Sequence, residues 1–258
     1  FAKEICLLLF QFDFIFKNEE INRVITLLKN WDGKEEINSE EALFFHSIIR
    51  EVIQNIYEDE LSLLGDAYFE AFLGLKYLYT RNLRRLLQHH SSSWFDNITT
   101  TNKRETIKDI LKISLYDGIN AVIKEYGKLE ENRKWGKAHS LIHPHLLGEV
   151  ELLNKIFKFN VGPFLSGGSD KTIRAGGFSY SDPFRQTAGA SMRRIVDFDN
   201  LDEIDIILPT GQSGLSHSPH YKDQSKLYHN GKYKKTLFNE TSIRKKSNYK
   251  KLYLLPHR

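Results

Sequence analysis

Residues 105–126 read ETIKDILKISLYDGINAVIKEY, and this stretch decides the fold of the first half of the chain. Its apolar residues recur every three or four positions, as Ile107, Ile110, Leu111, Leu115, Ile119, Val122 and Tyr126. That spacing places them on one face of an α-helix. Residues 41–56 show the same period, and Asn38 and Ser39 precede them as candidate capping residues. We therefore expect a helical first half, with a third helical stretch over residues 61–88.

The period of the apolar residues shortens near Trp135, where Gly, Pro, Ser and His become frequent. Within residues 190–198 every second residue belongs to the same set of side chains, so successive residues would point to opposite faces. That is the spacing of a β-strand. Asp199-Asn200 begins a turn, residues 204–208 form the next strand, and Pro209 ends it because proline cannot donate to a strand ladder. The pattern predicts an antiparallel hairpin and an α+β fold, with a mainly helical segment 1–130 and a sheet-rich segment 131–258.

Composition limits the class of protein. The chain has 258 residues, 40% of them hydrophobic, which allows one large domain or two small ones. A net charge of +4 is too small to indicate nucleic-acid binding, and Arg81, Arg84 and Arg85 are interpreted as a solvated or salt-bridged face, with nucleic-acid binding as the minor alternative. Cys6 is the single cysteine and cannot form an internal disulfide. No apolar run of 18 residues predicts a membrane span.

The start of the chain is apolar but contains Lys3 and Glu4 and lacks a basic front, so it is a poor signal peptide. Residue 1 is Phe rather than Met. We interpret the start as the middle of a longer protein, in a processed or truncated chain. An artificially trimmed chain is the alternative.

Four segments, in the same order, resemble the penicillin acylase (penicillin amidase) family. They are Leu27–Gly33 with its Trp-Asp-Gly, Trp135–Gly148 with Trp-Gly-Lys-Ala-His, Gly167–Arg193 with two glycine pairs, and Leu208–Gln224 with Leu-Pro-Thr-Gly-Gln-Ser-Gly. The last segment is the most specific, and the resemblance extends from about Leu27 to Phe238.

The resemblance implies an N-terminal nucleophile hydrolase with a four-layer αββα sandwich, made as a precursor that cleaves itself. In that family a serine at the new N-terminus attacks an amide carbonyl, and its own amine acts as the general base. The nucleophile, the oxyanion-hole asparagine and most calcium-binding carboxylates lie upstream of the Trp-Asp-Gly segment. Phe1 has no nucleophilic atom. We therefore assign no catalytic, cofactor-binding or metal-binding residue within this chain and expect the isolated chain to be inactive.

The expected partners follow from the same resemblance. They are the N-terminal remainder of the precursor, comprising the alpha chain and the start of the beta chain, and a small N-acyl substrate. No nucleic acid is expected. No cofactor is expected in this chain, and the family calcium site is expected upstream. The expected location is periplasmic or extracellular.

Several matched residues allow two interpretations. Gly167-Gly168 and Gly176-Gly177 favour loops or tight strand entries, since the spacing of Lys171-Thr172 departs from that of a phosphate-binding loop. Ser213 is interpreted as a turn residue, because Leu215 stands where a nucleophile elbow needs glycine. Asp182 and Arg185 are expected to form a local ion pair.

The histidine-rich positions are interpreted in the same way. A zinc site at His139, His143 and His145 is disfavoured, because Pro144 interrupts any helix and no carboxylate or cysteine completes the set nearby. The residues His220, Tyr221, Asp223 and Gln224 are interpreted as a buried polar network, with a place near the active site as the alternative.

The apolar residues of the basic tail, residues 231–258, are expected to dock on the core as a last strand, with the lysines facing water, because Lys250–Leu255 is too apolar to stay solvated. Binding to an acidic surface is the alternative.

Two functions remain open from sequence. One is a self-processing amidase acting on β-lactam side chains or acyl-homoserine lactones. The other is a non-catalytic relative that binds a partner. If the protein is the self-processing amidase, strands of the second half of this chain are expected to surround a catalytic amine that another part of the precursor supplies.

Overall fold

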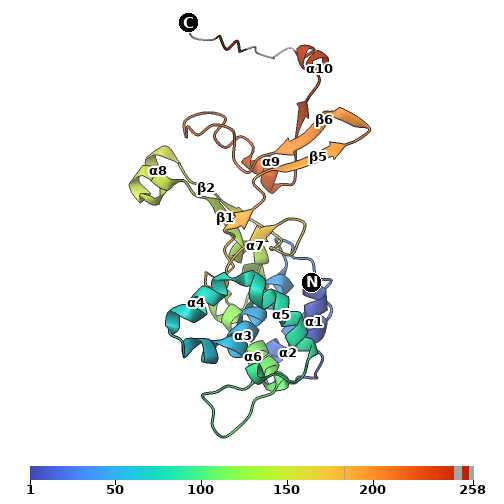
Figure 1. The fold of residues 1–258 in the computed structure, drawn as a ribbon, viewed down its shortest axis with the longest axis vertical. Helices are drawn as coiled ribbons and strands as arrows, with labels where there is room; N and C mark the ends of the chain where they lie inside the picture. Colours follow the sequence, from blue (N-terminus) through green and yellow to red (C-terminus); the bar gives the residue numbers. More distant parts are fainter. Residues whose placement is uncertain (183, 247–251, 256–258) are drawn as a thin grey trace. The chain divides into compact units, whose positions relative to one another are not determined.

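A computed structural model describes residues 1–182, 184–246 and 252–255. It divides into two compact units (Figure 1). Unit 1 comprises residues 1–142 and 163–189, and unit 2 comprises residues 143–162 and 190–258. The chain passes between the units within β1 (Ser140–His143) and β2 (Val161–Leu165), which form a two-stranded sheet, and again after residue 189. The expected boundary between residues 130 and 131 therefore does not coincide with a boundary between units.

Unit 1 is built from helices that surround α3 (Figure 1). Buried side chains lie all around the first half of α3, and α6 is its most extensive partner. The helices are α1 (Ala2–Leu9), α2 (Glu19–Lys29), α3 (Glu40–Ser62), α4 (Asp66–Gly74), α5 (Lys76–Gln88), α6 (Ile107–Tyr126) and α7 (Trp135–Ala138), with short 3₁₀ turns η1 (Ser93–Phe95) and η2 (Glu130–Asn132).

The helix starts are set by local hydrogen bonds. The Ser39 hydroxyl accepts from the Ala42 amide at 3.0 Å, as expected, and Thr106 forms a capping box with Asp109 at the start of α6. The expected stretch 61–88 is split into the end of α3, then α4 and α5. Gly65 has φ +117 immediately before α4, a conformation that breaks helical continuity.

The crossing of α3 and α6 depends on Gly118. A Cβ at this position would lie 2.7 Å from the Ile48 Cα, so any larger residue would collide with the backbone of α3. The Ser47 hydroxyl donates to the Gly118 carbonyl at 2.8 Å across the same contact. This close approach brings the two apolar stripes together.

Residues 131–142 belong with the helices because Arg133 is buried against them. Its Nη1 lies 2.6 Å from Glu20 Oε1 and its Nε lies 2.7 Å from Glu40 Oε1. Residues 163–189 add β3 (Gly176–Gly177), which pairs with β4 (Ala188–Gly189).

Unit 2 contains the three-stranded antiparallel sheet β5-β6-β7. Its strands are β5 (Arg193–Asp197), β6 (Asn200–Ile207) and β7 (Lys234–Leu237), and its short helical segments are η3 (Leu146–Glu149), α8 (Glu151–Phe157), α9 (Ser225–His229) and α10 (Glu240–Arg244). The predicted hairpin is confirmed, with Val196 opposite Ile204, and β6 ends before Pro209. The α+β class is likewise confirmed.

A strand does form within the tail, but the expectation that Lys250–Leu255 would be covered is wrong for its described residues. Lys250 and Lys251 lie outside the described residues, and Leu252–Leu255 form no strand and are at least 75% exposed. The strand of the tail is β7 instead. Lys235 there lies 3.3 Å from Asp205 on β6 and 3.7 Å from Glu203, so opposite charges pair across the two strands.

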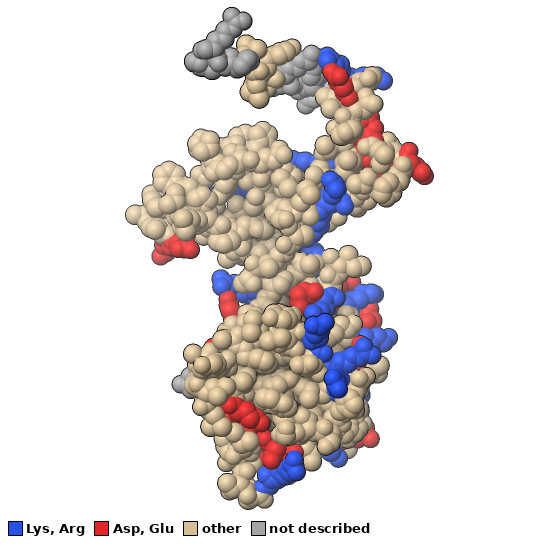
Figure 2. Space-filling model, viewed as in Figure 1, with Lys and Arg blue, Asp and Glu red and all other residues tan. Residues whose placement is uncertain are grey.

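Apolar burial is concentrated in unit 1, whose core draws on α1 to α7 and on Phe178, Tyr180 and Phe184. In the described part of unit 2, the buried large apolar side chains are Val161, Ile207, Tyr221 and Tyr228. Many others are exposed there, and Figure 2 shows a largely uncharged surface over α8 in this view. No helix in the described ranges is both long and apolar enough to cross a bilayer.

Candidate functional site

Two of the four segments singled out from sequence meet in unit 1, and both contact residues 35–37, which follow the Trp-Asp-Gly segment. The Trp135 indole donates to the Gly168 carbonyl at 2.9 Å, and the Gly168 amide donates to the Glu35 carbonyl at 2.6 Å. The Gly136 amide donates to the Ile37 carbonyl at 2.8 Å. These bonds join the Trp-Gly-Lys-Ala-His segment, the glycine-rich segment and the residues that follow the Trp-Asp-Gly segment, while residues 208–224 belong to unit 2.

Glycine is required where these segments touch. Gly168 has φ +81, and a Cβ there would lie 2.3 Å from the Arg174 carbonyl oxygen. A Cβ on Gly167 would lie 2.9 Å from the Glu35 carbonyl oxygen. The expectation of a tight glycine loop is confirmed, and its physical reason is close backbone approach.

A stack of three aromatic rings forms the centre of the site. Trp135 lies between His46 and His139, with ring centroids 4.5 Å away on each side. Phe178 meets Trp135 and His46 edge-on. All four side chains are buried, and the stack ties α3 to α7 and to residues 163–189 of the same unit.

Polar and charged groups lie around this stack. We call them, with His46, the buried ionic cluster: Glu35, His46 and Tyr180 are buried, Lys76 is half-buried, and Asp170 reaches the surface. Glu35 Oε2 lies 3.2 Å from His46 Nε2, and the other ring nitrogen of His46 lies 3.3 Å from the Tyr180 hydroxyl. Lys76 Nζ lies 2.8 Å from Asp170 Oδ1 and 3.2 Å from the centre of the Phe178 ring. Positive charge over an aromatic face adds to the ion pair.

Burial shifts the pKa values of these groups in opposite directions. Burial raises the pKa of Glu35, but the nearby His46, Ser169 and Lys76 outweigh it, so the pKa lies below its usual range. Burial lowers the pKa of Lys76, and Asp170 offsets only part of that effect. Burial raises the pKa of Tyr180 well above its ordinary value. The cluster therefore favours ionised Glu35 and neutral Tyr180 at neutral pH.

His139 is held in its neutral form. Burial lowers its pKa to about 4, partly offset by the hydrogen bond that its Nδ1 makes with the Phe184 carbonyl at 2.6 Å. That contact requires the proton on Nδ1, because a carbonyl can only accept. The Nε2 atom is buried with no hydrogen-bond partner in the described part of the chain.

The buried ionic cluster lies beside an open groove of about 750 Å³ on the same unit. The groove is lined by residues 33–38, by Gly167 and Gly168, and by residues 172–174. Glu35 contributes to both the cluster and the groove wall, yet its side chain is only 2% exposed. The cluster therefore fixes the position of the loops that form the groove, and Glu35 and His46 are too enclosed to reach a substrate there.

Sequence reasoning missed Glu35, His46, Lys76 and Tyr180. One signal could have indicated His46, because it is a polar residue inside the apolar run Ala42–Ile49. The other three had no comparable signal, since each gains its partner only through the fold.

The three histidines considered for zinc do not form one site. His139 is stacked on Trp135 in unit 1, whereas His143 lies 3.4 Å from His229 and His145 stacks on Phe159, both within unit 2. Within the described ranges, no group of three or more His, Cys, Asp or Glu side chains could hold a metal ion.

The polar residues of the last segment divide between interior and surface. The Tyr221 hydroxyl donates to the Phe159 carbonyl at 2.5 Å, and Gln224 Oε1 accepts from the Leu208 amide at 3.1 Å, so both belong to a buried network. The prediction was wrong for His220 and Asp223, which pair at 3.3 Å on the surface, where Asp223 also binds Lys234 at 3.0 Å. The His220 side chain is 71% exposed because its turn faces away from the unit's small interior.

Three further expectations about local contacts are confirmed. The Ser213 hydroxyl accepts from the Leu215 amide at 3.2 Å, as a turn residue does. Arg185 Nε donates to Asp182 at 3.0 Å. Arg84 pairs with Glu4 at 2.8 Å on an exposed face of α5.

Comparison with known proteins gives a consistent result. The family model described as penicillin amidase matches residues 1–245. The acyl-homoserine lactone acylase QuiP of Pseudomonas putida is 25% identical over 247 residues, covering 94% of this chain and 29% of that protein. The protein of the same name from Pseudomonas aeruginosa is 28% identical over 242 residues, covering 90% of this chain and 28% of that protein.

Among solved structures, a thermostable penicillin G acylase from Alcaligenes faecalis is similar with a TM-score of 0.48 and 15% identity. The match covers all of this chain and 46% of that chain. The chain thus spans less than a third of the length of the acylases that it matches in sequence.

Proposed function

The chain belongs to the penicillin amidase family, and from this premise we propose that it is part of a hydrolase that cleaves an acyl group from a linear amide. The observation that carries the proposal is the family match over residues 1–245, which extends through both units. A match that continues through separately packed units supports a shared architecture more strongly than a match to one motif.

The favoured substrate class is an acyl-homoserine lactone, with a β-lactam side chain as the second candidate. Relatives named acyl-homoserine lactone acylases, at 25% and 28% identity, favour the first. Each substrate presents an N-acyl amide to attack, so one mechanism serves both.

The proposed chemistry is acyl transfer to a serine that lies outside these 258 residues. The α-amino group of that serine accepts the hydroxyl proton, directly or through water, and the hydroxyl oxygen attacks the amide carbonyl. The amine leaves, and water then hydrolyses the acyl-enzyme. This chain contributes scaffold: the buried ionic cluster and the aromatic stack hold the glycine loop and the groove in place.

The remainder of the precursor is the proposed partner of unit 2. Side chains such as Leu152, Ile195, Phe198 and Leu201 are more than half exposed on this unit, and a surface of this kind favours coverage by other polypeptide. We propose that β5, β6 and β7 join a larger four-layer αββα sandwich with that remainder. The calcium site is proposed to lie there too, since the described residues offer no suitable donor set. The proposed location is the periplasm or the extracellular space.

The experiment is expression of the complete coding sequence, followed by analysis of chain cleavage and of turnover. We expect cleavage into two chains and hydrolysis of a series of N-acyl-homoserine lactones, with penicillin G as the comparison substrate. Replacing the serine at the new N-terminus with alanine is the control and should abolish turnover. A precursor that neither cleaves nor hydrolyses any member of the series contradicts the proposal.

The alternative is a non-catalytic relative that retains the fold and binds a partner. The upstream coding sequence separates the two. A glycine–serine junction some hundreds of residues before Phe1 supports the hydrolase, whereas an initiator Met immediately before Phe1 supports the binding protein.

A further inference from the structure

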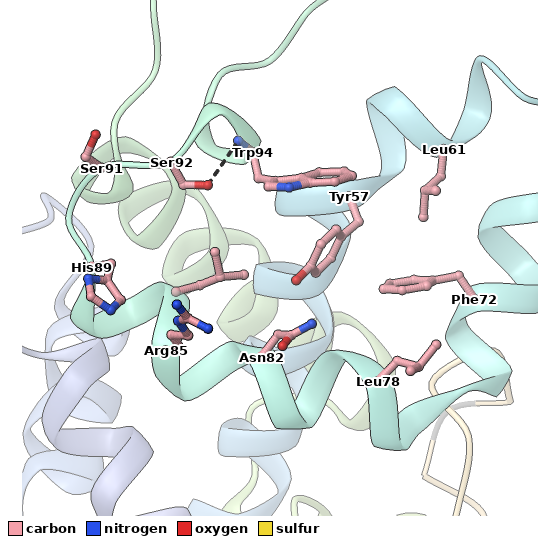
Figure 3. Close-up of a pocket in the computed structure, with 11 residues that line it drawn as sticks. Tyr57, Leu61, Phe72, Leu78, Asn82, Arg85, His89, Ser91, Ser92 and Trp94 are labelled. Carbon is pink, nitrogen blue, oxygen red and sulfur yellow. Dashed lines mark hydrogen bonds between the residues drawn. The ribbon is translucent and has the colours of Figure 1, made fainter.

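A pocket in unit 1 lies apart from the buried ionic cluster and is not used by the proposed chemistry. It has a volume of about 530 Å³ and is lined by residues of α3, α4 and α5 and of the segment that follows α5 (Figure 3). That volume falls within the range of small-molecule binding sites. All of its lining residues belong to unit 1.

One wall of the pocket is aromatic. The Tyr57 ring lies 4.9 Å from the Phe72 ring and 5.2 Å from the Trp94 ring, centroid to centroid. Figure 3 shows Phe72 and Leu61 at one end of the pocket, with Tyr57 and Trp94 above its middle. Trp94 remains 38% exposed, so this wall offers apolar surface to a ligand.

The opposite wall is one face of α5, and its polarity changes along the helix. Leu78, Asn82, Arg85 and His89 follow one another at spacings of three or four residues and all line the pocket. Leu78 lies at the apolar end, whereas Arg85 and His89 lie at the other end (Figure 3). The pocket therefore has an apolar end and a polar end.

The polar end is positively charged and has no counter-charge in its lining. The lining contains Arg85 but no Asp or Glu, and α5 itself contains no acidic residue. In the described part of the chain, the Arg85 guanidinium forms no ion pair, whereas the neighbouring Arg84 pairs with Glu4. A guanidinium binds a carboxylate through two parallel hydrogen bonds, so a carboxylate is the complementary ligand group.

We propose that this pocket binds an amphipathic carboxylate, with its apolar body against Phe72, Leu78 and Trp94 and its carboxylate at Arg85. The proposal requires no reaction and does not rest on the proposed function. Binding is reversible, and no covalent bond forms.

The test is photolabelling of the complete protein with a decanoate that carries a diazirine on its chain, followed by peptide mapping. We expect label on peptides from residues 57–94 and competition by unlabelled decanoate. Peptide mapping separates this pocket from an active-site pocket elsewhere in the protein, so failure of the amidase proposal does not affect the result. Absence of label from the peptides of residues 57–94 overturns the proposal. The proposal is equally overturned where another segment of the protein fills the pocket and excludes the probe.

Two matched variants test the role of the charge. Arg85→Gln should weaken decanoate binding about tenfold or more, because the variant loses the charge-assisted hydrogen bonds to the carboxylate. Arg81→Gln, on the same helix but outside the pocket lining, should leave binding unchanged. Decanamide should bind the unaltered protein as weakly as decanoate binds the Arg85→Gln variant. Equal decanoate affinity in the two variants overturns the assignment, and circular dichroism checks that both retain their helices.

Discussion

At the scale of single residues, the structure gives roles to side chains that the motifs alone left undefined. His139 belongs to the Trp-Gly-Lys-Ala-His segment and was considered as a zinc ligand. Its ring instead stacks on Trp135, and its Nδ1–H is bound to the Phe184 carbonyl. A ring held neutral in this way makes stability depend on pH.

The free energy of unfolding should fall as pH falls from 6.5 to 4, because His139 binds a proton more readily in the unfolded chain. Its pKa is about 4 in the fold and 6.5 in the unfolded chain, a difference worth about 3 kcal/mol at most. That stabilisation is complete above pH 6.5 and is lost toward pH 4. Urea unfolding of the complete protein at several pH values, followed by tryptophan fluorescence, measures the change.

The control for this prediction is His139→Phe, which keeps a ring on Trp135 but cannot titrate. The variant should be less stable at neutral pH by about 1 to 3 kcal/mol, since the Phe184 carbonyl loses its donor. It should also lose less stability than the unaltered protein between pH 6.5 and 4. The pKa of Glu35 is lowered, so its ionised carboxylate stabilises the fold above the pH range in which it titrates. This contribution is present in both proteins, so the difference between their two pH profiles isolates the contribution of His139. Parallel pH profiles would contradict the assignment.

At the scale of elements, helices α3 and α6 were predicted from their apolar periodicity, and their contact depends on a residue that the pattern does not indicate. Gly118 lies within α6, where glycine is normally unfavourable. Its missing side chain allows the α3 backbone to approach.

Gly118→Ala should destabilise the protein by about 1 to 3 kcal/mol, because the added Cβ forces the two helices apart. Gly74→Ala is the matched control. Nothing lies within 4 Å of a Cβ at that helical position, so the change should be neutral or stabilising by about 0.5 to 1 kcal/mol. Thermal unfolding of both variants gives the comparison, and a neutral Gly118→Ala would show that the helices do not need this close contact.

At the scale of the whole molecule, the two units differ in how they can be stabilised. Unit 1 has a continuous apolar core, whereas unit 2 buries few large apolar side chains in its described part. Apolar burial is the main favourable term in folding, so unit 2 alone has little to offset its conformational entropy.

Backbone amides of β5 and β6 should exchange with deuterium much faster in the isolated 258-residue chain than in the complete protein. The physical reason is that other polypeptide covers the exposed apolar side chains of unit 2 in the complete protein. Amides of α3 and α6 serve as the internal control and should show little difference, since their surroundings lie within unit 1. Equal protection of β5 and β6 in both samples would show that unit 2 is self-sufficient.

The sequence by itself determined the local elements and the family. Apolar spacing predicted α3, α6 and the β5–β6 hairpin, because helix and strand periods depend only on neighbouring residues. The four matched segments identified the penicillin amidase resemblance, which the family match confirms.

Only the tertiary structure decided which segments of the chain meet. Glu35, His46, Lys76 and Asp170 come from four separate parts of unit 1, and no sequence period relates them. The strand of the tail is β7, and this followed from its pairing with β6, which lies far away in the sequence. Such contacts depend on the free energy of bringing distant segments together, which the pattern of one segment does not contain.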